Sequence, residues 1–226
     1  IASAHKLWPQ TDVLVGIGSR LEVTSWRWRY QPSGLRTIRI DIDPQEMRRF
    51  PADIGIIADA REGAASLAAA LRRVGVTHPG RRSEARAAKE LTALEVAKVQ
   101  PQMDFLNAIR AVLPRDGIFV DEISQVGFTS WFGFPVFAPR TFISSGYQGT
   151  LGAGFPTALG VKVACPDKAV VSVTGDGGFM FGIQDLATAA QYGIGVITIV
   201  FNNNSFGNVR RDQQLQFEGR VIGADL

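Results

Sequence analysis

Apolar residues recur along this chain at two spacings, every second residue in some segments and every third or fourth residue in others. Ile38, Ile40 and Ile42 show the first spacing, which is typical of strands. Leu67 and Leu71 show the second, which is typical of helices. Strands are predicted at residues 12–18, 35–43, 53–59, 117–121, 141–144, 169–174 and 195–201. Helices are predicted after Pro44 and at residues 60–73, 83–99, 103–113, 151–164 and 179–192.

The alternation of strands and helices predicts an α/β fold with doubly wound parallel sheets, in which helices cover both faces of each sheet. The pattern is interrupted once, because residues 77–82 indicate a loop and the helix at 83–99 is charged with few large apolar residues. We therefore predict an α/β domain at residues 1–74, a linker with a surface helix at 75–102, and a second α/β domain at 103–226.

Both ends of the chain suggest that the sequence continues beyond them. The first residue is Ile1 rather than Met, and residues 220–226 complete no predicted helix or strand. We expect a piece of a longer polypeptide in which both domains are incomplete, the second at its C-terminal end.

Composition narrows the classes of function. The net charge is +3, from 24 basic and 21 acidic residues, and the arginine pairs are scattered rather than gathered into the basic stripe that nucleic-acid binding needs. No apolar run approaches the roughly 20 residues of a membrane span. The single cysteine, Cys165, permits no internal disulfide and is interpreted as a packing residue near a helix end. We predict a cytoplasmic protein that binds neither nucleic acid nor membrane.

The candidate chemistry begins where a predicted strand ends in Gly175-Asp176-Gly177-Gly178 and a helix follows. Ligands of open α/β sheets bind beyond the carboxyl ends of the strands. Glycines allow close approach of the backbone, and free N–H groups at a helix start suit a phosphate. Asp176 would repel that phosphate unless a cation lay between them, so the segment indicates a phosphate bridged by a metal ion.

The next predicted strand runs into Asn202-Asn203-Asn204. An amide oxygen from Asn203 suits a hard ion such as Mg²⁺, and it should converge with the Asp176 carboxylate from the neighbouring strand. Gly207 permits a sharp turn that can direct a backbone carbonyl to the same ion. Taken singly, the Gly-Asp-Gly segment is most often a turn and the asparagine run most often a loop; their position after successive strands favours a site.

These residues also resemble a known family. Gly175-Asp176-Gly177, followed after 24 residues (178–201) by Asn202-Asn203, is similar to the diphosphate-binding motif of thiamine-diphosphate-dependent enzymes. Residues 145–160 resemble the segment that holds the aminopyrimidine ring in the acetolactate synthase and benzoylformate decarboxylase branch. Residues 16–20 and 40–44 resemble motifs of that branch's middle domain.

The resemblance implies a set of ligands for thiamine diphosphate and Mg²⁺. Asp176 and Asn203 match side-chain ligands of the metal, and Ser205 matches the residue that offers its backbone carbonyl. Gly177 and Gly178 match backbone donors to the diphosphate, and Gly149 matches a carbonyl acceptor for the pyrimidine amine. Leu151 matches an apolar wedge under the bent cofactor, and Gln125 matches a loop residue beside the diphosphate.

The implied activity is decarboxylation or carboligation of a 2-oxo acid. The family starts this chemistry with a glutamate from a pyrimidine-binding domain, usually in a neighbouring subunit of a homodimer or homotetramer. That domain has no match here, and neither Glu122 nor Glu218 has its context, so no catalytic residue is assigned and the chain alone is expected to be inactive. Some relatives bind FAD near the positions of Arg20 and Asp41; FAD is not predicted here and stays open.

The chain departs from acetolactate synthases at two places. It has Asn208-Val209 where those enzymes have a glutamine–tryptophan pair, and Val126 where they tend to have histidine. Two other functions also stay open, a non-catalytic or regulatory cofactor-binding homologue and, because the fold class would also serve one, a dinucleotide-dependent oxidoreductase. The second is weak, because Gly16-Ile17-Gly18 has Leu21 where the dinucleotide motif needs its third glycine.

Overall fold

The computed structural model describes residues 2–28, 30–146 and 148–226, and it leaves the side chains of Trp26 and Arg27 outside the description. The chain divides into two compact units, unit 1 at Ile1–Thr92 and unit 2 at Ala93–Leu226. The boundaries predicted for the two domains and the linker between them remain predictions, at 1–74, 75–102 and 103–226.

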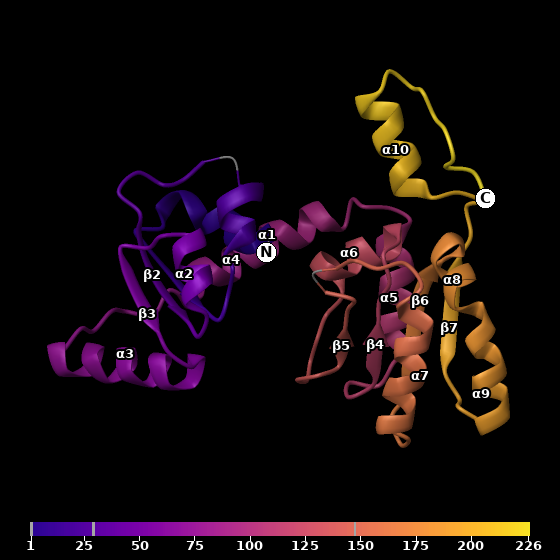
Figure 1. Ribbon diagram of the computed structural model, residues 1–226, viewed down its shortest axis with the longest axis horizontal. Helices are drawn as coiled ribbons and strands as arrows, with labels where there is room; N and C mark the ends of the chain where they lie inside the picture. The colour runs from indigo at the N-terminus through magenta and orange to yellow at the C-terminus, as the bar shows by residue number, and fades with distance from the viewer. Residues whose placement is uncertain (1, 29, 147) are drawn as a thin grey trace. The chain divides into compact units, whose positions relative to one another are not determined.

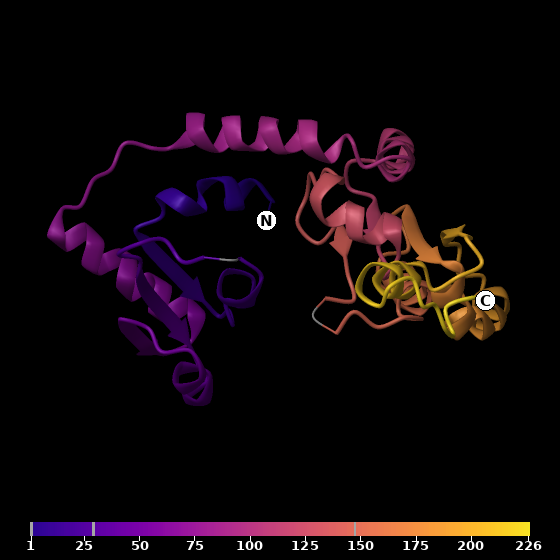
Figure 2. The same cartoon turned by 90° about the horizontal axis from the view of Figure 1, so that it is seen from above.

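Unit 1 contains a parallel three-stranded sheet in the order β1-β2-β3, with short helical segments before β1 and β2 and a further helix after α3 (Figure 1). Its elements are α1 (Ala2–Leu7), η1 (Trp8–Gln10), β1 (Val13–Ile17), η2 (Val23–Arg27), β2 (Arg36–Asp41), α2 (Pro44–Arg49), β3 (Ile54–Ile57), α3 (Ala60–Val74) and α4 (Arg82–Val96). The last of these runs into the first residues of unit 2 and is one straight helix (Figure 2).

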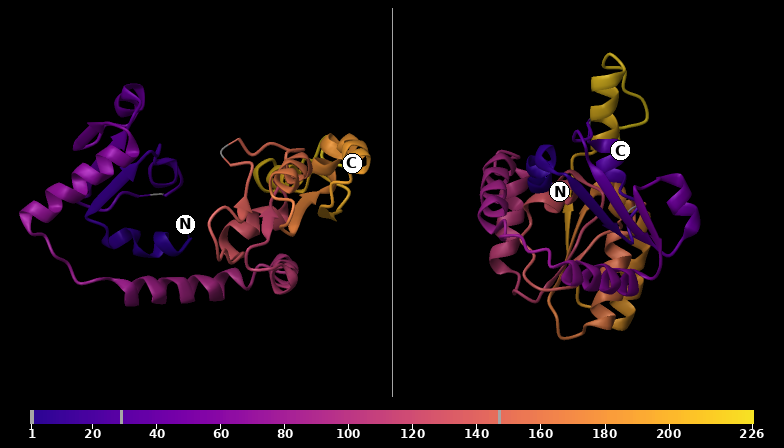
Figure 3. Two further views of the ribbon diagram at one scale, coloured as in Figure 1. Left: turned by 90° about the horizontal axis from the view of Figure 1, so that it is seen from below. Right: turned by 90° about the vertical axis from the view of Figure 1, so that its left-hand side faces the viewer.

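Helices lie on both faces of the sheet of unit 1. On one face Ile40 of β2 is buried against α3, where only a glycine, Gly63, leaves room for it; the left-hand view of Figure 3 shows α3 beside the strands. On the other face the buried Arg39 donates hydrogen bonds to the carbonyl oxygens of Glu46 (2.8 Å) and Phe50 (2.7 Å) and so ties β2 to α2. Asp43 caps α2 by accepting the Gln45 N–H, as its place before Pro44 predicts.

Unit 2 contains a parallel four-stranded sheet in the order β5-β4-β6-β7. Its elements are α5 (Gln102–Val112), β4 (Ile118–Val120), α6 (Gln125–Gly133), β5 (Phe142–Ile143), α7 (Gly154–Ala164), β6 (Val170–Gly175), α8 (Asp176–Gly182), η3 (Ile183–Asp185), α9 (Leu186–Tyr192), β7 (Ile197–Phe201) and α10 (Gly207–Gln216). In Figure 1 the segment after α10 returns beside that helix to the C-terminus.

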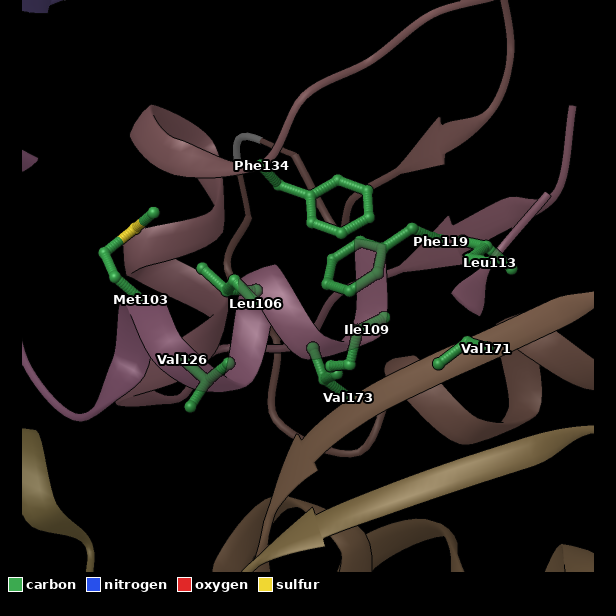
Figure 4. Packing of buried hydrophobic residues seen from close by; sticks show 9 residues of the cluster. All are labelled: Met103, Leu106, Ile109, Leu113, Phe119, Val126, Phe134, Val171 and Val173. Atoms are coloured by element: carbon green, nitrogen blue, oxygen red, sulfur yellow. The ribbon is translucent and has the colours of Figure 1, made fainter. Parts of the chain in front are cut away.

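Successive residues of the central strands supply two separate cores. On one side of the sheet, residues of α5 and α6 pack against Phe119, Val171 and Val173 of β4 and β6 (Figure 4). On the other side, Ala158 of α7 packs against strand residues that include Val120. The prediction of doubly wound parallel sheets is therefore confirmed for this unit.

Several predicted elements differ from those observed. The helix predicted at 179–192 begins at Asp176 and is interrupted by the 3₁₀ turn η3, and the helix predicted at 151–164 begins only at Gly154. The sequence predicts a loop at Gln125, but this residue is the first of α6. Cys165 follows α7 directly and packs, half-buried, beside its core, as predicted. Within the described residues, none of the helices combines the length and apolarity needed to cross a bilayer.

Candidate functional site

A cavity of about 420 Å³ opens in unit 2 beyond the carboxyl ends of β4, β6 and β7. This is the edge of a parallel sheet at which ligands bind in open α/β folds. Its lining comprises Pro101, Gln102, Phe105, Ile123, Ser124, Gln125, Val126, Leu151, Gly175, Asp176, Gly177, Gly178, Phe201, Asn202, Asn203, Ser205, Phe206, Gly207, Asn208 and Val209. The cavity therefore gathers seven of the eight predicted site residues.

The pairing of β6 with β7 brings Asp176 and Asn203 together. Gly175 lies opposite Phe201 in the sheet, so the two strands end at the same level. Asp176 then opens α8, and the Asn203 N–H donates a hydrogen bond of 3.2 Å to the Asp176 Oδ2. The carboxylate and the asparagine predicted to share a metal ion thus meet at one point of the cavity.

The turn after β7 is shaped by its own asparagine side chains. Asn202 Oδ1 accepts the Asn204 N–H at 2.9 Å, and Asn203 Oδ1 accepts the Ser205 N–H at 3.2 Å. Asn204 adopts a left-handed backbone, with φ of 53°, which asparagine tolerates better than most residues. Ser205 is buried at the end of this turn and pairs with Asp225 in an isolated β-bridge, so the C-terminal residues hold the turn in place.

The two glycines at the start of α8 are surrounded by protein atoms. A Cβ on Gly177 would lie 2.7 Å from the Phe206 ring, and a Cβ on Gly178 would overlap the carboxylate of Glu122. The sequence predicts that these glycines allow close approach of a ligand. The structure shows that their neighbours within the chain already require them, and both still line the cavity as the first turn of α8.

The remaining predicted residues lie at different places. Gln125 lies at the cavity and its side-chain amide donates to the Asn208 Oδ1, which joins α6 to α10. Leu151 also lines the cavity. Gly149 does not line the cavity, and its backbone is left-handed (φ 59°). A Cβ added at this position would be in van der Waals contact with Ile123, which does line the cavity.

Several residues of this site have no role assigned from the sequence, although Asn208 is noted as a departure from acetolactate synthases and Glu122 is considered and set aside as the catalytic glutamate. Ile123 and Asn208 line the cavity, and Phe105 brings an aromatic ring from α5, 5.1 Å from the ring of Phe201. Glu122, which has no exposed surface, lies behind the wall. The only signal for Glu122 and Ile123 is their place two and three residues after the end of the buried strand β4.

One acidic group near the site, Asp121 beside Glu122, is itself buried. Burial raises the pKa of Asp121 above its usual range, and hydrogen bonds from the Trp131 indole and the Ser144 hydroxyl oppose that rise. Among the described residues, no group of three or more His, Cys, Asp or Glu side chains gathers as a metal cage. A metal ion here would thus be held by one carboxylate together with neutral oxygens and the ligand's own, a set that suits Mg²⁺ bound with a phosphate.

Comparison with known families assigns both parts of the chain to one kind of enzyme. Residues 122–226 match the C-terminal TPP binding domain of thiamine pyrophosphate enzymes, and residues 1–68 match the central domain of thiamine pyrophosphate enzymes.

Individual relatives agree with this assignment. A probable acetolactate synthase large subunit of Methanocaldococcus jannaschii is 34% identical, over 93% of this chain and 38% of that protein. The acetolactate synthase large subunit of Haemophilus influenzae is 32% identical over the same shares of the two chains. A probable 2-ketoarginine decarboxylase of Pseudomonas aeruginosa is 29% identical, over 94% of this chain and 38% of the relative. The chain thus spans about 38% of the length of these relatives.

A solved structure shares the fold. The thiamine diphosphate-dependent 4-hydroxybenzoylformate decarboxylase of Rhodococcus jostii superposes with a TM-score of 0.70 at 24% identity, covering 95% of this chain and 40% of that one.

Proposed function

Because this chain belongs to the thiamine pyrophosphate enzyme family, we propose that it binds thiamine diphosphate through Mg²⁺ as part of an enzyme that decarboxylates or ligates a 2-oxo acid. The observation that carries the proposal is the meeting of Asp176 with Asn203 at the carboxyl ends of β6 and β7. When bound, the cofactor supplies a thiazolium ring that accepts the electron pair released as a 2-oxo acid loses carbon dioxide.

The chain's own residues fit Mg²⁺ and a diphosphate. Asp176 supplies the single negative charge, and Asn203 and the Ser205 carbonyl supply neutral oxygens from a turn beside it. The first turn of α8, at Gly177 and Gly178, supplies backbone N–H groups that suit a phosphate oxygen. Gln125 also lines the cavity, and its side-chain amide donates to Asn208. Leu151 offers an apolar surface for a ring.

The reaction itself is proposed at the level that the two kinds of relatives share. Acetolactate synthases and 2-oxo acid decarboxylases both act on 2-oxo acids, and the departures at Val126 and Asn208-Val209 leave the choice between them open. We propose that a glutamate of a pyrimidine-binding domain outside these residues starts the reaction, within a homodimer or homotetramer in the cytoplasm. Binding of FAD by unit 1 is not part of the proposal.

Calorimetric titration of thiamine diphosphate into the full-length protein, with and without Mg²⁺, tests the proposal. Asp176→Ala should weaken Mg²⁺-dependent binding by at least about 100-fold, since loss of groups that merely support a metal ligand already costs about 10–100-fold. Asp167→Ala is the matched control, because Asp167 is an exposed carboxylate outside the cavity. Equal binding by wild type and Asp176→Ala would refute the proposed site.

A non-catalytic homologue is the remaining alternative. It would bind the cofactor as the enzyme does, so calorimetry does not separate the two. Release of carbon dioxide from a panel of 2-oxo acids by the full-length protein does, and a protein that binds the cofactor tightly but turns over none of them would favour the regulatory alternative.

A further inference from the structure

Glu122 is a buried carboxylate that the proposed chemistry does not use. It lies two residues after the end of β4 and has no exposed surface. Its two carboxylate oxygens accept separate backbone hydrogen bonds, Oε1 from the Gly152 N–H at 2.8 Å and Oε2 from the Gly154 N–H at 2.9 Å. A buried charge is tolerated when such donors surround it, and it is favoured at the start of a helix such as α7.

The same carboxylate also lies against α8. A side chain on Gly178 would overlap Oε1, and a Cβ on Gly154 would lie 2.7 Å from Oε2. The glycines at both positions therefore allow one carboxylate to contact the starts of two helices, α7 and α8. These contacts join segments that are far apart in the sequence.

Each of the joined segments carries part of the cavity wall. Ile123 and Gln125 follow Glu122 itself, Leu151 immediately precedes the first of the two donors, and Gly177 and Gly178 open α8. Gly152 has a left-handed backbone (φ 81°), so the segment turns sharply at the residue that the carboxylate holds. The position of Leu151 relative to α8 thus depends on a carboxylate that does not itself line the cavity.

We propose that Glu122 is a positioning residue, whose carboxylate holds residues 149–154 and the start of α8 in the arrangement that binds the cofactor. The inference rests on the proposed binding of thiamine diphosphate. A carboxylate is needed because it offers two acceptor oxygens at once. The amide of glutamine offers one acceptor, and its NH₂ group would face a second donor and leave that donor unpaired.

The test compares the affinity of the full-length protein for thiamine diphosphate, at saturating Mg²⁺, with hydrogen–deuterium exchange of residues 149–154 in the absence of cofactor. Glu122→Gln should weaken binding by about tenfold or more, as loss of groups that orient a ligand site does. It should also speed exchange at residues 149–154 while β6 stays protected. A residue that only stabilised the fold would change exchange in β6 as well.

A second variant keeps the test decisive if Glu122→Gln does not fold. Gly154→Ala keeps the Glu122 side chain but forces its carboxylate away from α7, and should also weaken binding and speed exchange at residues 149–154. Gly160→Ala is its matched control, because Gly160 lies in the same helix with open space around it. This control should bind the cofactor as the wild type does.

The outcomes separate the two proposals. If the wild type does not bind thiamine diphosphate with Mg²⁺, the proposed function fails and the inference fails with it. If the wild type binds and both Glu122→Gln and Gly154→Ala bind equally well, only the positioning role is overturned. Weaker binding with unchanged exchange at residues 149–154 also overturns it, because the effect would then not pass through that segment.

Discussion

Leu106 is a position at which a substitution should lower the stability of unit 2 without changing its candidate site. The side chain lies on α5 with no exposed surface, in the core cluster that includes Phe119 and Val173 (Figure 4). Its neighbour in sequence, Phe105, points instead to the cavity. Leu106→Ala therefore removes buried volume on the core side of the helix and leaves the cavity lining in place.

The expected loss follows from the burial. Replacing a buried leucine with alanine costs about 2–5 kcal/mol, with larger values where packed neighbours cannot close the gap. The neighbours here are strand residues and stacked aromatic rings, such as Phe119 and Phe134 with centroids 4.1 Å apart, which cannot move far. We take about 3 kcal/mol, which corresponds to a roughly 100-fold larger opening constant of unit 2.

Hydrogen–deuterium exchange of β6 measures this change for unit 2 alone, because a buried central strand exchanges only when its unit opens. Leu106→Ala should speed exchange in β6 by about 100-fold. Val112→Ala is the control on the same helix; Val112 is 80% exposed, and its loss should change exchange little. Equal exchange in the two variants would refute the assignment of Leu106 to the core.

Two further predictions concern buried positions. Gly63→Ala should destabilise unit 1 by about 1–3 kcal/mol in urea denaturation, because the new Cβ would overlap Ile40. Gly80→Ala is the control and should not destabilise it, because Gly80 has open space around it. Equal urea midpoints for the two variants would contradict this prediction. Asp121→Asn should flatten the pH dependence of the free energy of unfolding. Burial raises the pKa of Asp121 in the folded state above its ordinary 3.8, so between these two pKa values the folded state holds a proton that the unfolded state has lost. The wild type therefore loses stability as the pH rises from the ordinary to the raised pKa. Parallel pH profiles of unfolding free energy for wild type and variant would contradict the second.

The meeting of Asp176 with Asn203 could be predicted because it depends only on local rules. Both residues follow apolar strands one strand–helix–strand unit apart, and parallel strands end at the same edge of a sheet. The pattern of the central strands was equally informative, since β4 and β6 are buried on both faces. The identities of the ligands at this edge remain a prediction.

Features that depend on contacts between distant segments could not be predicted. Glu122 lies next to strand β4 in the sequence, but its partners Gly152 and Gly154 are 30 and 32 residues away. No local pattern distinguishes it from a surface glutamate. The start of α6 was missed for a different reason, because Ser124 caps it through the Gly127 N–H and a single serine is a weak signal. The interruption between α8 and α9 likewise had no apolar signature.

The exposure of β7 should affect the apparent affinity of the site for its ligand. Among the described strands it pairs only with β6, and Ile197 is 63% exposed, whereas β6 is almost wholly buried. Within the described residues Asn203 and Ser205 therefore follow a strand that is less buried than the one carrying Asp176, and less buried strands open more readily. A ligand that requires both strand ends binds only the molecules in which β7 is paired with β6, so the apparent dissociation constant rises as the fraction of such molecules falls. Substitutions in β7 that never contact the ligand should thus change its affinity, and the ligand should in turn slow opening of the strand.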